Sequence, residues 1–147
     1  VEMTIPSILD KSLTPENSNH HVIGLFCQYA PFELQKGKVW DDNLKKEFSS
    51  RVYAEVEKYA PGFTQSILFE DLLSPLDLQN QFSLTGGNIF HGSMDINSIS
   101  FCRPTPNNSE YKQPIKNLFS CSSAMHPGGG VMGAPGRNCA LTALKYI

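Results

Sequence analysis

The 147-residue sequence lacks several signatures that would assign it to a common functional class. It has no apolar stretch approaching the ~18 residues that a membrane-spanning helix needs. It has no run of basic residues, and its formal net charge is −2, which argues against nucleic-acid binding. No Gly-Lys-Ser or Gly-Lys-Thr follows its glycine run, which argues against a P-loop nucleotidase.

Cysteine is also scarce, and its spacing does not suggest a metal site. None of the four cysteines, Cys27, Cys102, Cys121 and Cys139, has a partner at the Cys-x-x-Cys spacing. We therefore expect no thiolate-bound metal, and no other metal site is predicted. Cys27 and Cys121 lie within apolar runs, so we expect them to be small, reduced, buried core residues.

The apolar content of 40% is enough for one packed domain. The clearest helix spans residues 41–60, with Asp41 or Asp42 as its cap and one apolar stripe formed by Leu44, Phe48, Val52, Val56 and Tyr59. A second, short helix is predicted after Ser74, and a third over 134–146. Strands are predicted at 21–29, 65–72, 96–101 and 118–122, and residues 3–9 are predicted as an edge strand or an entry segment. The strand at 21–29 is apolar enough to be buried on both faces. Mixed strands with three helices indicate the α+β class.

The most informative stretch runs from Leu118 to Ala140. It reads as a short strand, then a glycine-rich loop, then a helix with Pro135 in its first turn, where a missing N–H is tolerated. Three consecutive glycines, Gly128 to Gly130, let a ligand approach the main chain. The unpaired N–H groups of a helix N-terminus carry partial positive charge. This order of elements favours a site for a flat, anionic ligand.

Three motifs resemble the phytoene-desaturase-like FAD oxidoreductases. The run from His126 to Asn138, His-Pro-Gly-Gly-Gly-Val-Met-Gly-Ala-Pro-Gly-Arg-Asn, is similar to the C-terminal flavin-contacting motif of that family. The run from Leu84 to Gly92, Leu-Thr-Gly-Gly-Asn-Ile-Phe-His-Gly, resembles a second motif. Gln28-Tyr-Ala-Pro-Phe resembles a third. The three occur in the family's order and span most of the chain.

The resemblance implies a two-domain FAD/NAD(P)-binding flavoprotein of the Rossmann type, with FAD as its cofactor. Such proteins carry Gly-x-Gly-x-x-Gly after the first strand of an N-terminal Rossmann unit, and we expect this chain to lack that sequence. We therefore expect the chain to be a C-terminal fragment whose partner is a missing N-terminal Rossmann half. Residues 1–117 would belong to the substrate-side domain. Residues 118–147 would supply the last strand, glycine loop and helix of the FAD-binding domain.

The resemblance also assigns site residues. Those expected to contact FAD are Ser122, Ser123, His126, Gly128, Gly129, Gly130, Val131 and Gly133. At the start of the helix that follows the glycine loop, the helix dipole would stabilise electron density on the flavin as it is reduced. A side chain at Gly129 is expected to occupy space meant for the cofactor. His126 is the candidate for direct chemistry, with loop shaping as the alternative.

By resemblance, Asn88, Phe90 and His91 lie on the substrate side of the flavin and face a small-molecule substrate. The alternative is that this loop is only a structural connector. Ser122 departs from the family, whose members carry glycine there. This departure and the missing Rossmann half support a second hypothesis, a non-catalytic protein-interaction module or a degenerate fragment. By itself the chain is expected to be inactive.

Overall fold

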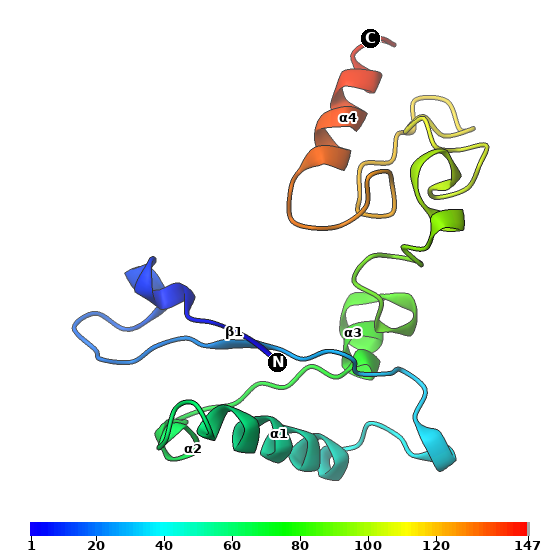
Figure 1. Cartoon of the computed structure of the whole chain (residues 1–147). Helices are drawn as coiled ribbons and strands as arrows, with labels where there is room; N and C mark the ends of the chain where they lie inside the picture. Colours follow the sequence, from blue (N-terminus) through cyan, green and yellow to red (C-terminus); the bar gives the residue numbers. More distant parts are fainter. Residues whose placement is uncertain (147) are drawn as a thin grey trace. The chain divides into compact units, whose positions relative to one another are not determined.

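The computed structural model describes residues 1–146, which form two compact units, residues 1–76 and the segment from Asp77 on. The first unit opens with an antiparallel pair, β1 (Glu2–Thr4) and β2 (Gly24–Phe26), in which Met3 lies opposite Leu25 (Figure 1). The strand predicted at 21–29 is confirmed only for residues 24–26, and its predicted burial on both faces is wrong. Only three residues pair, and Phe26 is 50% exposed, because the two-stranded sheet covers little surface.

Helix α1 (Asp42–Glu57) confirms the clearest helix prediction. The Asp41 carboxylate accepts a hydrogen bond from the Leu44 N–H at 2.8 Å, which is the expected cap. Val56 is buried, and Phe48 meets the buried Trp40 ring edge-on at 5.5 Å between ring centroids. Tyr59 is 84% exposed because the helix ends two residues earlier, so its place in the apolar stripe was wrong.

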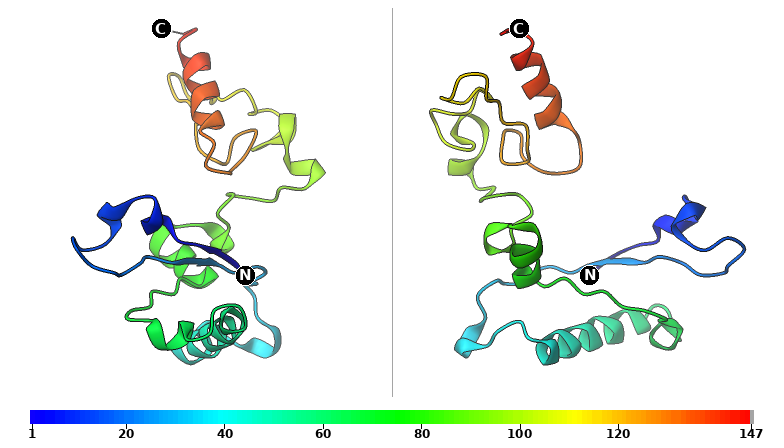
Figure 2. Two further views of the ribbon diagram at one scale, coloured as in Figure 1. Left: turned by 60° about the vertical axis from the view of Figure 1, so that its left-hand side comes forward. Right: turned by 180° about the vertical axis from the view of Figure 1, so that it is seen from behind.

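The predicted strand at 65–72 is replaced by a helical turn and an extended segment. Helix α2 (Phe63–Ser66) forms because the Glu57 carboxylate accepts hydrogen bonds from the N–H groups of Gly62 and Thr64. These bonds satisfy donors at the start of the turn. After α2 the chain returns toward α3 (Figure 2), and the Tyr53 hydroxyl donates a hydrogen bond to Glu70 on this segment.

Helix α3 (Pro75–Phe82) begins directly after Ser74, as predicted. The boundary between the two units falls within its first turn, after Leu76. The helix ends before Ser83, whose φ of +57° leaves the helical region. The Gly86 N–H then donates to the Gln79 side chain at 2.8 Å, which ties the following turn back to the helix.

The described part of the second unit contains no regular strand. Residues 96–101 form two 3₁₀ turns, Ile96–Ser98 and Ser100–Cys102, because the Asp95 carboxylate accepts from the Asn97 N–H and Ser100 has a φ of +55°. At 118–122 only one bridge forms, between Phe119 and Lys112. Both strand predictions were wrong.

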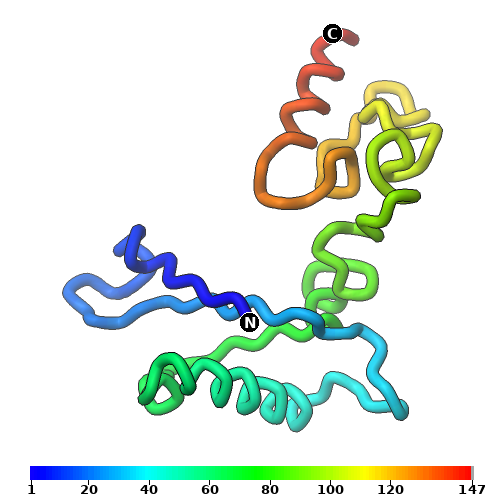
Figure 3. Tube along the Cα trace, in the orientation of Figure 1, coloured from blue at the N-terminus to red at the C-terminus, as the bar shows by residue number. Residues whose placement is uncertain are grey.

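Helix α4 (Ala134–Ala143) confirms the third helix, which ends three residues earlier than predicted. It follows the glycine loop directly, as the chain trace shows (Figure 3). The three predicted helices, the short α2 and the two-stranded sheet are compatible with the α+β class. The predicted domain boundary between residues 117 and 118 stays a prediction. The last residue of the second predicted domain, Ile147, lies outside the described residues.

Candidate functional site

The glycine loop has a backbone that side chains would rarely tolerate. Gly128, Gly130 and Gly133 have φ values of +102°, +133° and +68°. Their spacing is Gly-x-Gly-x-x-Gly, so the expectation that this chain lacks that sequence was wrong. Gly133 caps α4 without a side-chain hydrogen bond, and Pro135 lies in the first turn as predicted. The glycine spacing and the helix that follows match part of the dinucleotide-binding pattern, whereas the strand that should precede them is reduced to a single bridge at Phe119.

The structure brings two of the sequence motifs together through Phe90 and Gly129. A Cβ atom built on Gly129 would lie 2.7 Å from Phe90 Cδ1 and 3.6 Å from Ser123 Cβ. The space beside Gly129 is therefore filled by the Phe90 ring. We expected a side chain at Gly129 to occupy space meant for a cofactor. In this structure such a side chain would first collide with the Phe90 ring.

A buried arginine, which sequence reasoning missed because it lies in a loop without periodicity, is at the centre of this site. The Arg103 side chain is 3% exposed and donates to the carbonyl groups of both Phe90 and Ser123. It also lies 3.6 Å from the position of a Cβ on Gly128, measured to Nε. One feature of the sequence could have drawn attention to this residue: Arg103 is the only Lys or Arg between Lys58 and Lys112.

The loop is also tied to α4 through Tyr111, a second residue that sequence reasoning missed. The Tyr111 hydroxyl donates to the His126 carbonyl at 2.6 Å and accepts from Asn138 Nδ2 at 3.0 Å. The His126 side chain is exposed. The main chain of His126 thus helps to hold the loop, while its imidazole is exposed.

The remaining predicted residues divide into turn-forming and outward-facing groups. Asn88 Oδ1 accepts from the Phe90 N–H at 2.9 Å, and the His91 N–H donates to the Asn88 carbonyl at 3.0 Å, so Asn88 shapes the turn. Ser122 Oγ accepts from the Ala124 N–H at 3.1 Å, and its φ is not in the positive range, so glycine is not required there. Val131 is fully exposed.

The cysteines only partly follow the prediction. Cys121 is exposed and Cys27 is half-buried, so burial was wrong for Cys121. Cys139, on α4, is buried. Burial raises the pKa of the Cys139 thiol, and the neighbouring Cys121 thiol raises that pKa further. All four are free thiols.

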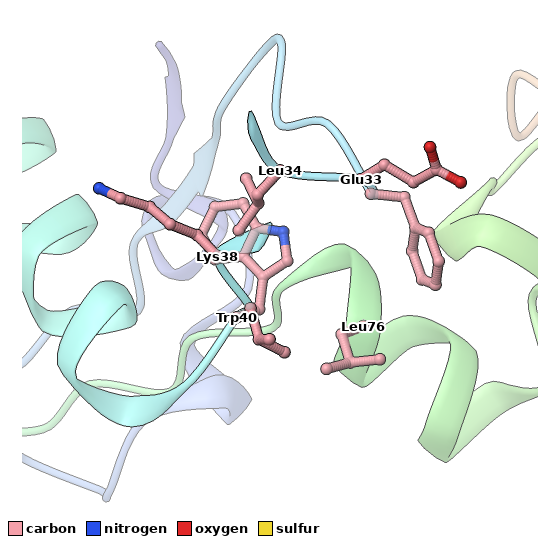
Figure 4. Close-up of a pocket in the computed structure, with 7 residues that line it drawn as sticks. Glu33, Leu34, Lys38, Trp40 and Leu76 are labelled. Atoms are coloured by element: carbon pink, nitrogen blue, oxygen red, sulfur yellow. The ribbon is translucent and has the colours of Figure 1, made fainter. Parts of the chain in front are cut away.

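A pocket in the first unit is lined in part by Phe32, the last residue of the motif at 28–32. It measures about 350 Å³, and its lining includes Leu34, Trp40 and Leu76. The Lys38 ammonium and the Glu33 carboxylate point away from each other at its opposite sides (Figure 4). Trp40 Nε1 is already bonded to the Pro31 carbonyl at 3.0 Å. Ligand sites have polar groups that converge, so this pocket is a weaker candidate than the glycine loop.

Within residues 1–146, no three His, Cys, Asp or Glu side chains are placed to hold a metal ion together. Among the helices of the same residues, none has the length and apolar character to cross a membrane.

Comparison with known proteins gives clear relatives. Pyridine nucleotide-disulfide oxidoreductase domain-containing protein 2 of Rattus norvegicus is 49% identical over 140 residues, covering 95% of this chain and 24% of that protein. The Mus musculus protein of the same name is 49% identical over 147 residues, covering 100% of this chain and 25% of that protein. A more distant relative is one of the polypeptides of the limonene dehydrogenase of Castellaniella defragrans, which is 23% identical over 146 residues, covering 97% of this chain and 26% of that polypeptide.

No protein-family model and no solved structure matches the chain. The chain spans about a quarter of the length of the curated relatives it matches. The similarity to the Mus musculus protein extends over the whole chain, and so over the motifs at 28–32, 84–92 and 126–138. The chain is therefore related over its full length to one quarter of pyridine nucleotide-disulfide oxidoreductase domain-containing protein 2.

Proposed function

We propose that the chain is part of an FAD-dependent oxidoreductase of the phytoene-desaturase-like family. Residues 118–146 contribute the glycine loop and α4 to the flavin site, and the Asn88–His91 loop faces the substrate. The observation that carries this proposal is the contact between Phe90 and Gly129, since it joins the two resembling motifs in one place. The names of the relatives support an oxidoreductase.

The residues around the start of α4 fit a flavin better than those around Gly129. Cβ atoms built on Gly133 and Gly136 meet nothing within 4 Å, so this side of the loop is open. The Gly133 cap provides no side-chain acceptor, which leaves the first-turn N–H groups available for a ligand. We therefore place the cofactor against residues 133–136.

In this proposal FAD, when bound, supplies the acceptor for a hydride. The N–H groups of the first turn of α4 stabilise negative charge at their end of the helix by about 0.3–1 kcal/mol, or up to ~2 kcal/mol when partly buried. His126 holds the loop through its carbonyl, and its exposed imidazole is the candidate for moving a proton. Phe90 excludes water from the space beside Gly129.

The exposed apolar side chains near the loop support a larger assembly. Val131 is fully exposed, and Leu141 and Leu144 on α4 are 48% and 67% exposed. Contiguous exposed apolar side chains mark surfaces that contact other polypeptide. We propose that the N-terminal Rossmann half of the whole protein covers them and binds the adenosine end of FAD. The same exposure favours the second hypothesis, a non-catalytic interaction module, so a direct test of flavin content is needed.

The test uses the full-length protein that carries this segment. We expect purified full-length protein to be yellow and to release about one FAD per chain on denaturation, whereas the isolated 147-residue chain binds FAD weakly or not at all. Colourless full-length protein that takes up no FAD on titration would contradict the proposal and favour the interaction module.

A further inference from the structure

We propose that Arg103 is a positioning residue that locks the glycine loop and the Asn88–His91 loop into one arrangement. The effect on FAD rests on the proposed function, whereas the locking of the loops does not. Arg103 is 3% exposed, and a buried charged side chain persists only when its donors find partners. Its partners are all carbonyl groups of the main chain.

The guanidinium uses each of its five N–H groups. Nε and Nη2 both donate to the Ser123 carbonyl, at 3.3 and 2.8 Å. Nη2 also donates to the Phe90 carbonyl. Nη1 donates to the carbonyls of Ser93 and Ser98, at 2.9 and 3.3 Å. A guanidinium has five donors, so none is left for a ligand, and Arg103 acts only through the loops it holds.

The geometry requires arginine in particular. Ser123 lies five residues before Gly128, whereas Phe90 belongs to the other motif, and one planar fork reaches both carbonyls. Lysine presents three donors from a single atom, so it cannot span the same four carbonyls. Removing the fork leaves the four carbonyl groups without these donors, and they regain partners only if water enters between the loops. The loops then separate, and Phe90 leaves Gly129.

The arrangement also explains why the two motifs occur together in this chain. The Phe90 ring fills the space beside Gly129, and the Phe90 carbonyl is held by Arg103. Gly128 lies over the same arginine, because its Cβ position is 3.6 Å from Arg103 Nε. Arg103 therefore fixes the loop at Gly128 and Gly129, whereas the open positions, Gly133 and Gly136, follow later in the chain.

The test compares Arg103→Lys with Arg103→Met in the full-length protein. Arg103→Lys is the decisive variant, because it keeps a cation in the site and removes only the fork. Arg51→Lys is the matched control, since the Arg51 side chain is 76% exposed on α1. Hydrogen exchange is measured on peptides covering 88–95 and 121–130, and FAD affinity by fluorescence titration together with the visible spectrum of the bound flavin.

We expect both Arg103 variants to exchange at least about tenfold faster in both peptides, with α1 unchanged. FAD should bind about tenfold more weakly, and the flavin band shape should move toward that of free FAD. The control should match the unaltered protein. Wild-type exchange in Arg103→Lys, or faster exchange in only one of the two loops, would overturn the proposal. If the unaltered protein takes up no FAD, the proposed function fails, and the exchange data still decide the role of Arg103.

Discussion

The ring of Phe90 occupies the space where a side chain at residue 129 would lie, because a Cβ on Gly129 would come within 2.7 Å of Phe90 Cδ1. Real Cβ atoms do not approach a ring this closely, so one of the two groups must move if Gly129 is replaced. Two loops that are 39 residues apart in the sequence, counted from 90 to 129, therefore depend on each other's shape.

This contact predicts coupling between Phe90 and Gly129. Gly129→Ala should destabilise the loop by about 1 kcal/mol, as overpacking does. In the double variant Gly129→Ala with Phe90→Ala, most of that cost should disappear, because the ring is no longer there. A double-mutant cycle monitored by hydrogen exchange of residues 121–130 measures the coupling. Additive effects would show that the two residues do not touch in solution.

Tyr111 should hold the glycine loop to α4. Tyr111→Phe removes the hydrogen bonds to the His126 carbonyl and to Asn138, and should loosen the loop by about 1 kcal/mol. The Gly128 N–H, which donates to the Met125 carbonyl at 2.7 Å, should exchange about fivefold faster. Tyr59→Phe is the control, because Tyr59 is 84% exposed. An unchanged Gly128 exchange rate in Tyr111→Phe would exclude this role.

The helices could be predicted from the sequence because their signals are local. The Asp41 cap and the apolar positions of α1 lie within a few turns of each other, and Ser74-Pro75 and Pro135 mark the other two starts. Three of the five predicted strands, at 65–72, 96–101 and 118–122, did not form, because a strand needs a partner. Residues 96–101 include Ile96, Ile99 and Phe101, yet the Asp95 cap and the positive φ of Ser100 turn them into 3₁₀ segments.

The site could be predicted only in part for a related reason. The motifs containing Gly129 and Phe90 stand out in the sequence, whereas their contact is set by tertiary packing. Arg103 lies in a segment without periodicity, and its role depends on four carbonyl groups, which are common to all residues. The one signal for Arg103 in the sequence was that no other Lys or Arg lies between Lys58 and Lys112. Nothing in the sequence marked Tyr111.

The cysteines should differ in reactivity in the isolated chain. Cys121 is exposed, whereas Cys139 is 6% exposed and burial raises the pKa of its thiol. Because the thiolate is the reactive form, iodoacetamide at pH 8 should modify Cys121 before Cys139. Peptide mass spectrometry over a time course measures the order. Faster modification of Cys139 would show that α4 does not pack as described.

The turn between α1 and α2 should open in acid. Hydrogen bonds to the Glu57 carboxylate, first from the Thr64 N–H, then from the Gly62 N–H and the Thr64 hydroxyl, lower the pKa of Glu57. A group with a lowered folded-state pKa contributes stability above its unfolded pKa of about 4.3, and this is lost as pH falls through the lower folded value. We expect the Thr64 amide resonance to shift below about pH 4. The resonance in Glu57→Gln should not shift over that range; a shift of equal size there would contradict the assignment.

The placement of FAD against the start of α4 makes Gly136 the most informative position. A Cβ on Gly136 meets nothing within 4 Å, so Gly136→Ala and Gly136→Leu should leave the fold intact. Alanine should favour the helix by about 1 kcal/mol over glycine. In the full-length protein, however, a side chain at this position would project into the space proposed for the cofactor. Ala140→Leu, at an exposed position one turn further along α4, is the matched control.

The most direct measurement is the FAD dissociation constant of full-length Gly136→Leu, titrated beside the unaltered protein and Ala140→Leu, with thermal unfolding recorded for all three. We predict at least about tenfold weaker FAD binding for Gly136→Leu alone, a loss of about 1.4 kcal/mol, with no decrease in the unfolding temperature. Equal FAD affinity in all three proteins would contradict the placement of the flavin at this helix.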